Sequence, residues 1–207
     1  MADPLLTLHQ MFSPAFPVGA FSYSHGLETA IATGRVGDAA DLRDWVSAAL
    51  EHGAGWSDAV LIAQSAGGED LSDLALALAV TSERRLETTA QGAAFAATVR
   101  DVWGVDVSDA PYPVAVGRAV AALGLPPGDA IRLYLQAFAA TLVSVGVRLI
   151  PLGQTEGQRL VLALTPLCER LADAALLADL DDLGGFAPVT EIDAMRHEVL
   201  PSRVFRT

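Results

Sequence analysis

Two residue types are missing from this chain of 207 residues, lysine and asparagine. All 13 basic residues are therefore arginine. Without lysine, the chain has no phosphate-loop lysine, no Schiff-base lysine and no Ser-Lys catalytic dyad. Without asparagine, it has no acceptor for N-linked glycosylation. The missing lysine thus excludes several classes of enzyme, and the missing asparagine excludes N-linked glycosylation.

Positive charge is also scarce relative to negative charge. The 13 arginines stand against 25 acidic residues, and the formal net charge is −12. Nucleic-acid-binding proteins obtain much of their affinity from basic side chains that neutralise phosphates, so we expect no nucleic-acid partner. The hydrophobic share of 52% argues against a disordered chain. A chain of this length typically folds as one domain, and it needs neither a disulfide nor a structural metal for stability.

Residues that usually carry metal or covalent chemistry are few. Cys168 is the single cysteine, and we interpret it as a small buried side chain. The four histidines form no HExxH pair and have no cysteine at zinc-ligand spacing. The sequence therefore predicts no catalytic residue, no metal site and no cofactor. An alternative, in which His25, His197 and Cys168 handle a metal, is weakened by their scattered positions.

The hydrophobic pattern predicts helices along the whole chain. Alanine and leucine are strong helix formers, and no segment alternates with a period of two. The apolar segment 133–151 contains Arg148 and ends at Pro151, so we interpret it as a core helix and expect a cytoplasmic protein with no membrane partner. We predict a single all-α domain, a bundle of about eight to ten helices. The expected helices cover residues 5–12, 24–32, 39–50, 58–65, 70–79, 82–103, 114–123, 129–150, 155–177 and 190–196.

Two helix starts have recognisable capping residues. The carboxylate of Asp38 is placed to accept the free amides at the start of the following helix. The segment 155–158, Thr-Glu-Gly-Gln, has the spacing of a capping box, in which the first and fourth side chains bond to each other's backbone amides. We therefore expect helices to begin just after Asp38 and at Thr155.

The segment 13–28, SPAFPVGAFSYSHGLE, is unusual because it places prolines, glycines and aromatics between two helices. One interpretation is a structural linker whose Phe16, Phe21 and Tyr23 insert into the bundle. The other is a recognition surface, because rigid aromatic side chains make good anchors for a partner.

The charges are segregated along the chain. Residues 36–83 hold nine acidic residues and one arginine, and residues 173–193 hold six acidic residues and no arginine. The tail then carries Arg196, Arg203 and Arg206. The acidic stretches are either ordinary solvated faces or surfaces that steer a basic partner. The tail is either a peptide that becomes ordered on binding or a frayed end.

Taken together, several segments of the sequence resemble the UreF family of urease accessory proteins. The segment 13–28 is similar to the family's N-terminal signature of Ser-Pro, Pro-Val-Gly, Phe-Ser-Tyr-Ser and Gly-Leu-Glu. Further matches are Tyr-Pro-Val-Ala at 112–115 with 121–127, the stretch 142–160 with Val-Arg-Leu-Ile-Pro-Leu-Gly-Gln at 147–154, and the C-terminal 195–206. The matches occur in the family's order and span nearly the whole chain.

The resemblance implies an all-α, cytoplasmic, homodimeric protein without catalytic activity. It implies that the chain bridges UreD (also called UreH) and the GTPase UreG while nickel is delivered to apo-urease. It assigns contacts with UreD to the N-terminal segment 1–24 and the C-terminal tail 196–207. By motif, the contact residues would be Phe16, Pro17, Phe21, Ser22 and Tyr23, together with Arg196, His197, Arg203 and Phe205. Arg148 and Gln154 would lie near the dimer centre, where UreG docks.

One position departs from the family pattern. Gln91-Gly92 is followed by Ala93, where family members often have arginine, so a contact made through that arginine is in doubt. A second hypothesis makes the chain a GTPase-activating or gating regulator of UreG. An arginine supplied by a partner accelerates some GTPases by 10³–10⁵. The chain is rich in arginine, but its sequence marks no particular arginine for that role.

Overall fold

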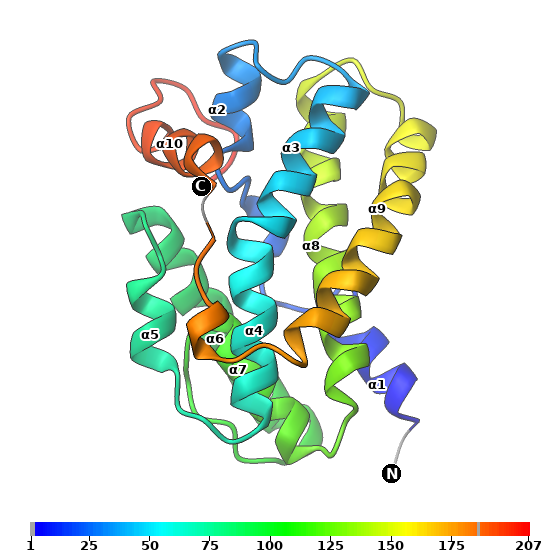
Figure 1. The fold of residues 1–207 in the computed structure, drawn as a ribbon, viewed down its shortest axis with the longest axis vertical. Coiled ribbons are helices and arrows are strands. Elements are labelled where there is room, and N and C mark those ends of the chain that lie inside the picture. The colour runs from blue at the N-terminus through cyan, green and yellow to red at the C-terminus, as the bar shows by residue number, and fades with distance from the viewer. Residues whose placement is uncertain (1–2, 186) are drawn as a thin grey trace.

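The protein is built from α-helices that pack around one central helix (Figure 1). The computed structural model describes residues 3–185 and 187–207. Within these ranges there is no strand, which confirms the all-α prediction. The α-helices are α1 (Pro4–Met11), α2 (Leu27–Ala32), α3 (Ala39–Glu51), α4 (Ala54–Ala66), α5 (Ser72–Ala77), α6 (Ser82–Trp103), α7 (Tyr112–Ala122), α8 (Pro127–Leu149), α9 (Gln154–Ala175) and α10 (Pro188–His197), with short 3-10 turns η1 (Ala20–Ser22) and η2 (Leu180–Asp182).

The central helix is α8. Its inward face carries Ile131, Leu135, Leu142 and Val145, which are fully or almost fully buried. It packs against α9 and α4, and also against α3, α2, α1 and α7. On the other side of α4, helix α7 lies between α4 and α6. The apolar face of α8 thus lies in the main core. A second, small cluster is formed by Leu61, Leu71, Ala75 and Val114 on and beside α4, α5 and α7.

Helix α8 is also long and apolar enough to cross a membrane by length and composition, and half of that window is buried inside the protein. Its packing against six other helices is that of a core helix. Cys168, on α9, is buried as predicted, and burial raises the pKa of its thiol to about 11.

Most helix ends lie within two residues of the prediction. The start predicted at residue 58 is wrong, because α4 begins at Ala54, directly after Gly53. Asp38 caps α3 by accepting the amides of Ala40 and Asp41, as expected. The capping box predicted at 155–158 is wrong: α9 begins one residue earlier, at Gln154, and extended Gly153 precedes it without any side-chain cap. The predicted start of α2 at residue 24 is also wrong. His25 and Gly26 both have positive φ angles, so the helix begins only at Leu27.

Candidate functional site

The C-terminal helix α10 has an inverted polarity. The side facing the protein body carries Thr190, Asp193 and His197, all buried. The side facing solvent carries Val189, Ile192, Met195 and, just beyond the helix, Val199, with exposed fractions between 45% and 79%. A surface helix normally buries its apolar stripe and exposes its polar one. An exposed stripe at helical spacing marks a surface suited to a further interaction.

Ion pairs attach the polar side of α10 to the body. Asp193 is paired with Arg35 and accepts the indole N–H of Trp45 at 3.4 Å. Two carboxylates flank the ring of His197: Nδ1 lies 2.8 Å from Glu83 Oε2, and Nε2 lies 3.1 Å from Glu28 Oε2. These contacts join α10 to α3, α2 and α6, and they explain why polar side chains occupy its inner side.

Close packing and a further carboxylate complete the attachment. A Cβ on Gly26 would meet the backbone of Ala194 at 2.5 Å, so only glycine lets the loop before α2 approach α10 this closely. Just after α10, Glu198 accepts the backbone amide of Ser82 at 2.8 Å and its hydroxyl at 2.7 Å. These hydrogen bonds lower the pKa of Glu198, and they place a negative charge at the N-terminus of α6.

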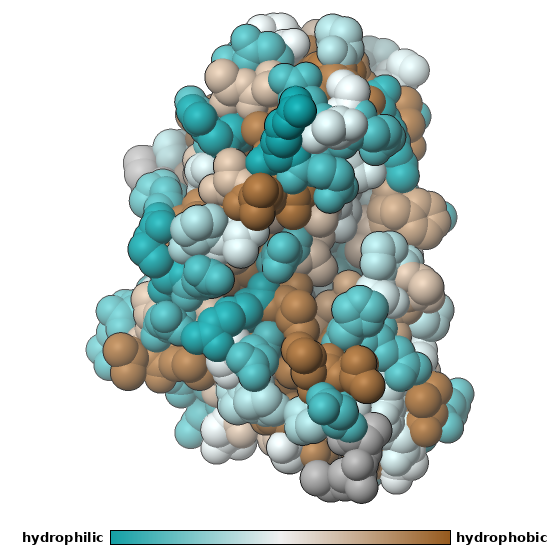
Figure 2. Space-filling view, turned by 90° about the vertical axis from the view of Figure 1, so that its right-hand side faces the viewer, coloured by the Kyte–Doolittle hydropathy of each residue, from teal (hydrophilic) through white to brown (hydrophobic). Residues whose placement is uncertain are grey.

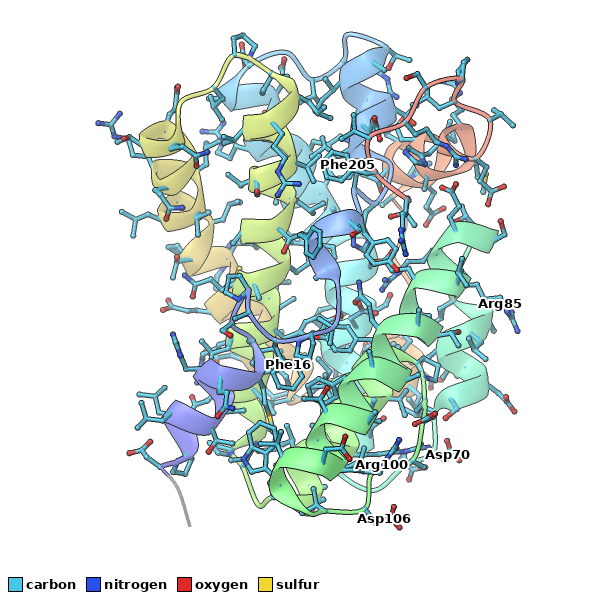
Figure 3. The ribbon with its side chains drawn as sticks, turned by 180° about the vertical axis from the view of Figure 1, so that it is seen from behind. Phe16, Asp70, Arg85, Arg100, Asp106 and Phe205 are labelled. Atoms are coloured by element: carbon cyan, nitrogen blue, oxygen red, sulfur yellow. The ribbon has the colours of Figure 1, made fainter. Side chains whose placement is uncertain are left out.

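The tail after α10 is ordered against the body, so neither of its two predicted states, a peptide that orders only on binding or a frayed end, is correct. Glu28 accepts the backbone amides of Val204 at 2.7 Å and Phe205 at 2.9 Å. Arg203 is paired with Glu83. The Phe205 ring is buried, and the Arg148 guanidinium lies 5.7 Å from its centroid (Figure 3).

The structure brings the two predicted partner-binding segments together. The Arg206 amide donates to the Ser22 carbonyl at 2.8 Å, and the Ser24 amide donates to the Thr207 carbonyl at the same distance. Residues 22–24 and the end of the tail therefore run side by side. Two segments from opposite ends of the sequence form one continuous surface next to α10.

The predicted contact residues divide into buried and exposed groups. Phe16 is buried, with its ring centroid 5.4 Å from that of Phe95 and 6.3 Å from that of Trp103 (Figure 3). Tyr23 is buried as well, so both act as the structural plugs of the linker interpretation. Phe21, by contrast, is 65% exposed. The buried group consists of Phe16, Tyr23, His197 and Phe205; Ser22 is half-buried, and the exposed group consists of Pro17, Phe21, Arg148, Gln154, Arg196 and Arg203.

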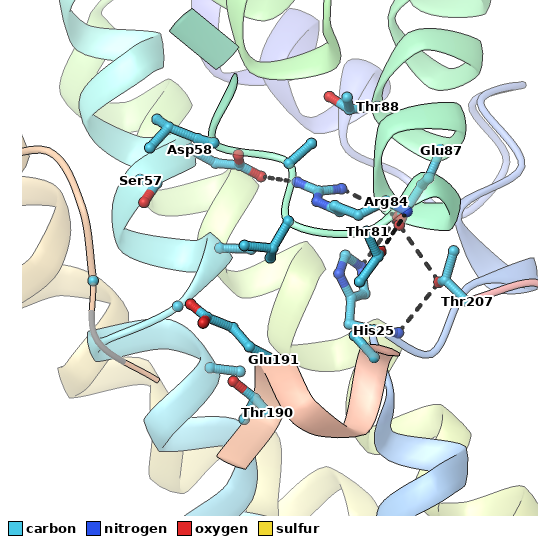
Figure 4. A pocket seen from close by; sticks show the side chains of 18 of the residues that line it. His25, Ser57, Asp58, Thr81, Arg84, Glu87, Thr88, Thr190, Glu191 and Thr207 are labelled. Carbon is cyan, nitrogen blue, oxygen red and sulfur yellow. Dashed lines mark hydrogen bonds and ion pairs between the residues drawn. The ribbon is translucent and has the colours of Figure 1, made fainter. Parts of the chain in front are cut away.

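A charged cluster that the sequence did not reveal lies behind the tail (Figure 4). Arg84 on α6 donates to Asp58 on α4 at 2.8 Å and lies 3.4 Å from Glu87. Glu87 also pairs with His25 at 3.1 Å, and Asp58 accepts the hydroxyl of Tyr134 at 2.6 Å. The sequence pattern does not predict this buried cluster, because charged residues in an amphipathic helix normally face solvent.

The electrostatics of this cluster follow from burial and pairing. Burial alone would lower the pKa of the Arg84 guanidinium, but Asp58 and Glu87 raise it well above its ordinary value. Burial likewise opposes ionisation of Glu87, yet His25 and Arg84 bring its pKa below the ordinary value. The pKa of Tyr134 is raised, mainly by burial and then by Asp58. Arg84 and Glu87 are therefore held as a buried ion pair.

Two cavities border this cluster. One, of about 370 Å³, lies between α4, α6 and α10. The other, of about 510 Å³, is a groove between the N-terminal segment and α8, with Phe12, Leu133 and Ala140 in its wall and Phe21 and Arg148 also lining it. Exposed apolar residues also occur on α1 and α9, where Leu5, Leu6 and Leu162 are more than 60% exposed. Figure 2 looks onto that side and shows hydrophobic residues interrupting the polar surface.

Metal-binding groups do not converge in the part of the chain that the structure describes. No group of three or more histidine, cysteine, aspartate or glutamate side chains there is arranged to hold a metal ion. His25 and His197 are engaged with glutamates, and Cys168 lies in the core.

Comparison with known proteins identifies what the chain is similar to. The family model UreF matches residues 36–165. The urease accessory protein UreF of Cereibacter sphaeroides strain KD131 is 52% identical over 210 residues, covering all of both chains. The protein of the same name from Ruegeria pomeroyi is 48% identical over 217 residues, again covering both chains completely. That of Rhodopseudomonas palustris strain HaA2 is 45% identical and covers 98% of this chain and 93% of the relative.

Proposed function

Because the chain belongs to the UreF family of urease accessory proteins, we propose that it is a non-catalytic adaptor in urease maturation. It bridges UreD (UreH) and the GTPase UreG in the cytoplasm while nickel reaches apo-urease. The observation that carries this proposal is the inverted polarity of α10. A surface helix that buries its polar side chains and exposes its apolar ones is suited to binding another protein through the exposed side.

The surface for UreD comprises the outer stripe of α10, the exposed tail residue Arg203 and the neighbouring N-terminal segment. Exposed apolar anchors surrounded by charged groups are typical of the centre and rim of a specific interface. Arg196 lies exposed in the last turn of α10, beside the stripe. The buried residues His197 and Phe205 support this surface from beneath and do not contact the partner directly.

A second surface serves self-association and UreG. The groove beside α8 and the exposed Phe21 lie on one face, so each copy offers both a projecting side chain and a recess. That combination suits a two-fold symmetric dimer, in which the same patch contacts itself. Arg148 lines this groove, and Gln154 lies exposed at the start of α9. We assign UreG to this region of the homodimer.

The α10 surface is tested by substituting its outer stripe. The double variant Ile192→Asp/Met195→Asp places two charges on the stripe and leaves the buried side of α10 intact. We expect it to fold normally and to lose co-purification with UreD. Val102→Asp is the matched control, because Val102 is 56% exposed on α6, away from α10. Normal recovery of UreD with the double variant would refute this assignment. Deleting 196–207 is a poorer test, since it removes the buried His197 and Phe205.

The alternative function is regulation of GTP hydrolysis by UreG, and one observation favours it. The Arg148 guanidinium is exposed and makes a cation–π contact with Phe205. An arginine used to activate a GTPase must be free to reach the nucleotide. GTP turnover by UreG, measured with the wild-type protein and with Arg148→Ala, decides the matter. Stimulation that is lost in the variant supports regulation, and unchanged turnover in both cases supports a passive adaptor.

A further inference from the structure

Helix α10 and the tail are attached to the body mainly through charged and polar groups. Apolar packing contributes little on the inner side of α10, where the buried side chains are Thr190, Asp193 and His197. The imidazole of His197 is completely buried and lies between carboxylates on two different helices, Glu83 on α6 and Glu28 on α2. The same two carboxylates hold the tail, through Arg203 and through the amides of 204 and 205. His197 is thus the centre of the whole attachment.

The contacts of His197 depend on its protonation state. Both ring nitrogens face carboxylate oxygens, and only the imidazolium ion can donate a hydrogen bond from both nitrogens. A neutral ring has one N–H and one lone pair, so one nitrogen would face a carboxylate lone pair to lone pair. Water cannot relieve this conflict, because the side chain has no exposed surface. Losing the proton therefore breaks one bridge and leaves either Glu28 or Glu83 with one donor fewer.

The summed charge around His197 also favours the protonated ring. With the ring protonated, His197 and Arg203 offset Glu28 and Glu83, so the formal charge of the four groups is zero. Without that proton the buried group carries one uncompensated negative charge. Other charged or titratable groups also lie near this junction. His25, Glu87, Arg84 and Asp58 form their own chain of pairs. Asp193 and Glu198 bond to Arg35 and Ser82, and Arg148 lies over the Phe205 ring.

We propose that His197 is a proton-dependent latch for α10 and the tail. When the ring is protonated, both bridges form and the docking surface is held in one arrangement. When it loses its proton, the attachment weakens and α10 with the tail opens more often. The latch rests on the proposed function only for the identity of the partner. Its chemistry lies entirely within this chain.

Hydrogen–deuterium exchange of the full-length protein tests the latch. Protection of backbone amides in peptides covering 188–207 is followed from about pH 6 to about pH 9 and corrected for the intrinsic pH dependence of exchange. We expect wild-type protection to fall about tenfold or more as the pH rises, the effect of losing one hydrogen bond between charged groups. Peptides from the centre of α8 should keep their protection. Protection at 188–207 that does not change with pH would refute the latch.

Two variants separate the latch from other titrations. His197→Gln should show low, pH-independent protection at 188–207, whereas His9→Gln, an exposed histidine on α1, should behave like the wild type. If His197→Gln fails to fold, Glu83→Gln replaces it, with weakened pH dependence expected because one carboxylate of the bridge is gone. A full wild-type pH response in either latch variant would also refute the proposal.

The outcome is distinguishable from failure of the proposed function. The double variant Ile192→Asp/Met195→Asp alters only the outer stripe, so it should retain the pH-dependent protection of the wild type. If the stripe does not bind UreD but the exchange profile is still pH-dependent and requires His197, then the adaptor assignment fails and the latch stands. If UreD binds the stripe and the profile is flat, then the latch alone fails.

Discussion

At the level of single residues, this chain buries charged side chains only where each one has a partner. Arg84 is held between Asp58 and Glu87, and each of these acids has a further partner, Tyr134 or His25. Every member of the cluster thus has an opposite charge or a hydrogen bond, as burial requires. The absence of lysine is consistent with this design, because a planar guanidinium can bond two carboxylates at once.

Removing the guanidinium should therefore be costly. Arg84→Ala leaves two buried carboxylates without their shared cation, and we expect the free energy of unfolding to drop by about 3–5 kcal/mol. The neighbouring Arg85→Ala is the control: Arg85 is exposed and donates only to the carbonyl of Leu76, so its loss should cost less than about 0.5 kcal/mol. Urea unfolding followed by circular dichroism measures both. Equal, small effects would show that the cluster contributes no net stability.

At the scale of helices, local signals set the boundaries wherever the chain makes its own caps. Helix α6 spans the residues that the sequence predicts, because Thr81 caps its start and Gly104, with a positive φ, ends it. The start of α2 was not predicted, because the chain is left-handed at His25 and at Gly26, and Gly26 lies directly against the backbone of α10. A tertiary contact overrides the local pattern there.

The cap of α3 offers a direct measurement of such a local signal. Asp38→Ala removes the acceptor for two amides, at 2.8 and 3.0 Å, and should lower the free energy of unfolding by about 1 kcal/mol. Asp44→Ala, in the same helix, removes an exposed carboxylate paired only with its neighbour Arg43, and should change stability by less than about 0.5 kcal/mol. Thermal unfolding of the two variants compares them. A loss at Asp44 as large as that at Asp38 would contradict the capping argument.

Helix α10 shows where reasoning from periodicity fails. Its apolar residues recur at helical spacing, which in a soluble protein normally indicates the buried side. Here that side faces solvent, because Arg35, Glu28 and Glu83 sit on the body at the positions that α10 contacts. No local pattern in residues 188–197 contains this information. The family resemblance singled out the tail 196–207, whereas the apolar stripe of α10 was not predicted and became visible only in the fold.

At the scale of the whole molecule, the fold assembles two faces from distant parts of the sequence. The tail meets residues 22–24 beside α10, and the N-terminal segment forms one wall of the groove along α8. The sequence motifs single out these two segments, and their role in partner binding stays a prediction. The motifs did not show that Phe16 and Tyr23 are buried while Phe21 is exposed. Burial depends on which helices lie opposite, and only the assembled bundle decides that.

The groove along α8 is the predicted site of self-association. Only half of the apolar window of α8 is buried within one chain, and the remainder borders the groove that Phe21 lines. If two copies pair through this groove, Ala140→Glu forces a carboxylate into the interface without a partner and should convert the dimer to a monomer. Ala163→Glu, an identical change on the exposed side of α9, should leave the dimer intact.

Sedimentation velocity over a range of concentrations compares these two variants with the wild type. If Ala140→Glu folds and still forms dimers, the dimer interface is not at this groove. If the wild type stays monomeric at every concentration, there is no basis for placing UreG at a dimer centre. Ile192 and Met195 do not line the groove, so we expect dimerisation to be unaffected by Ile192→Asp/Met195→Asp. Loss of UreD binding can then be distinguished from loss of self-association.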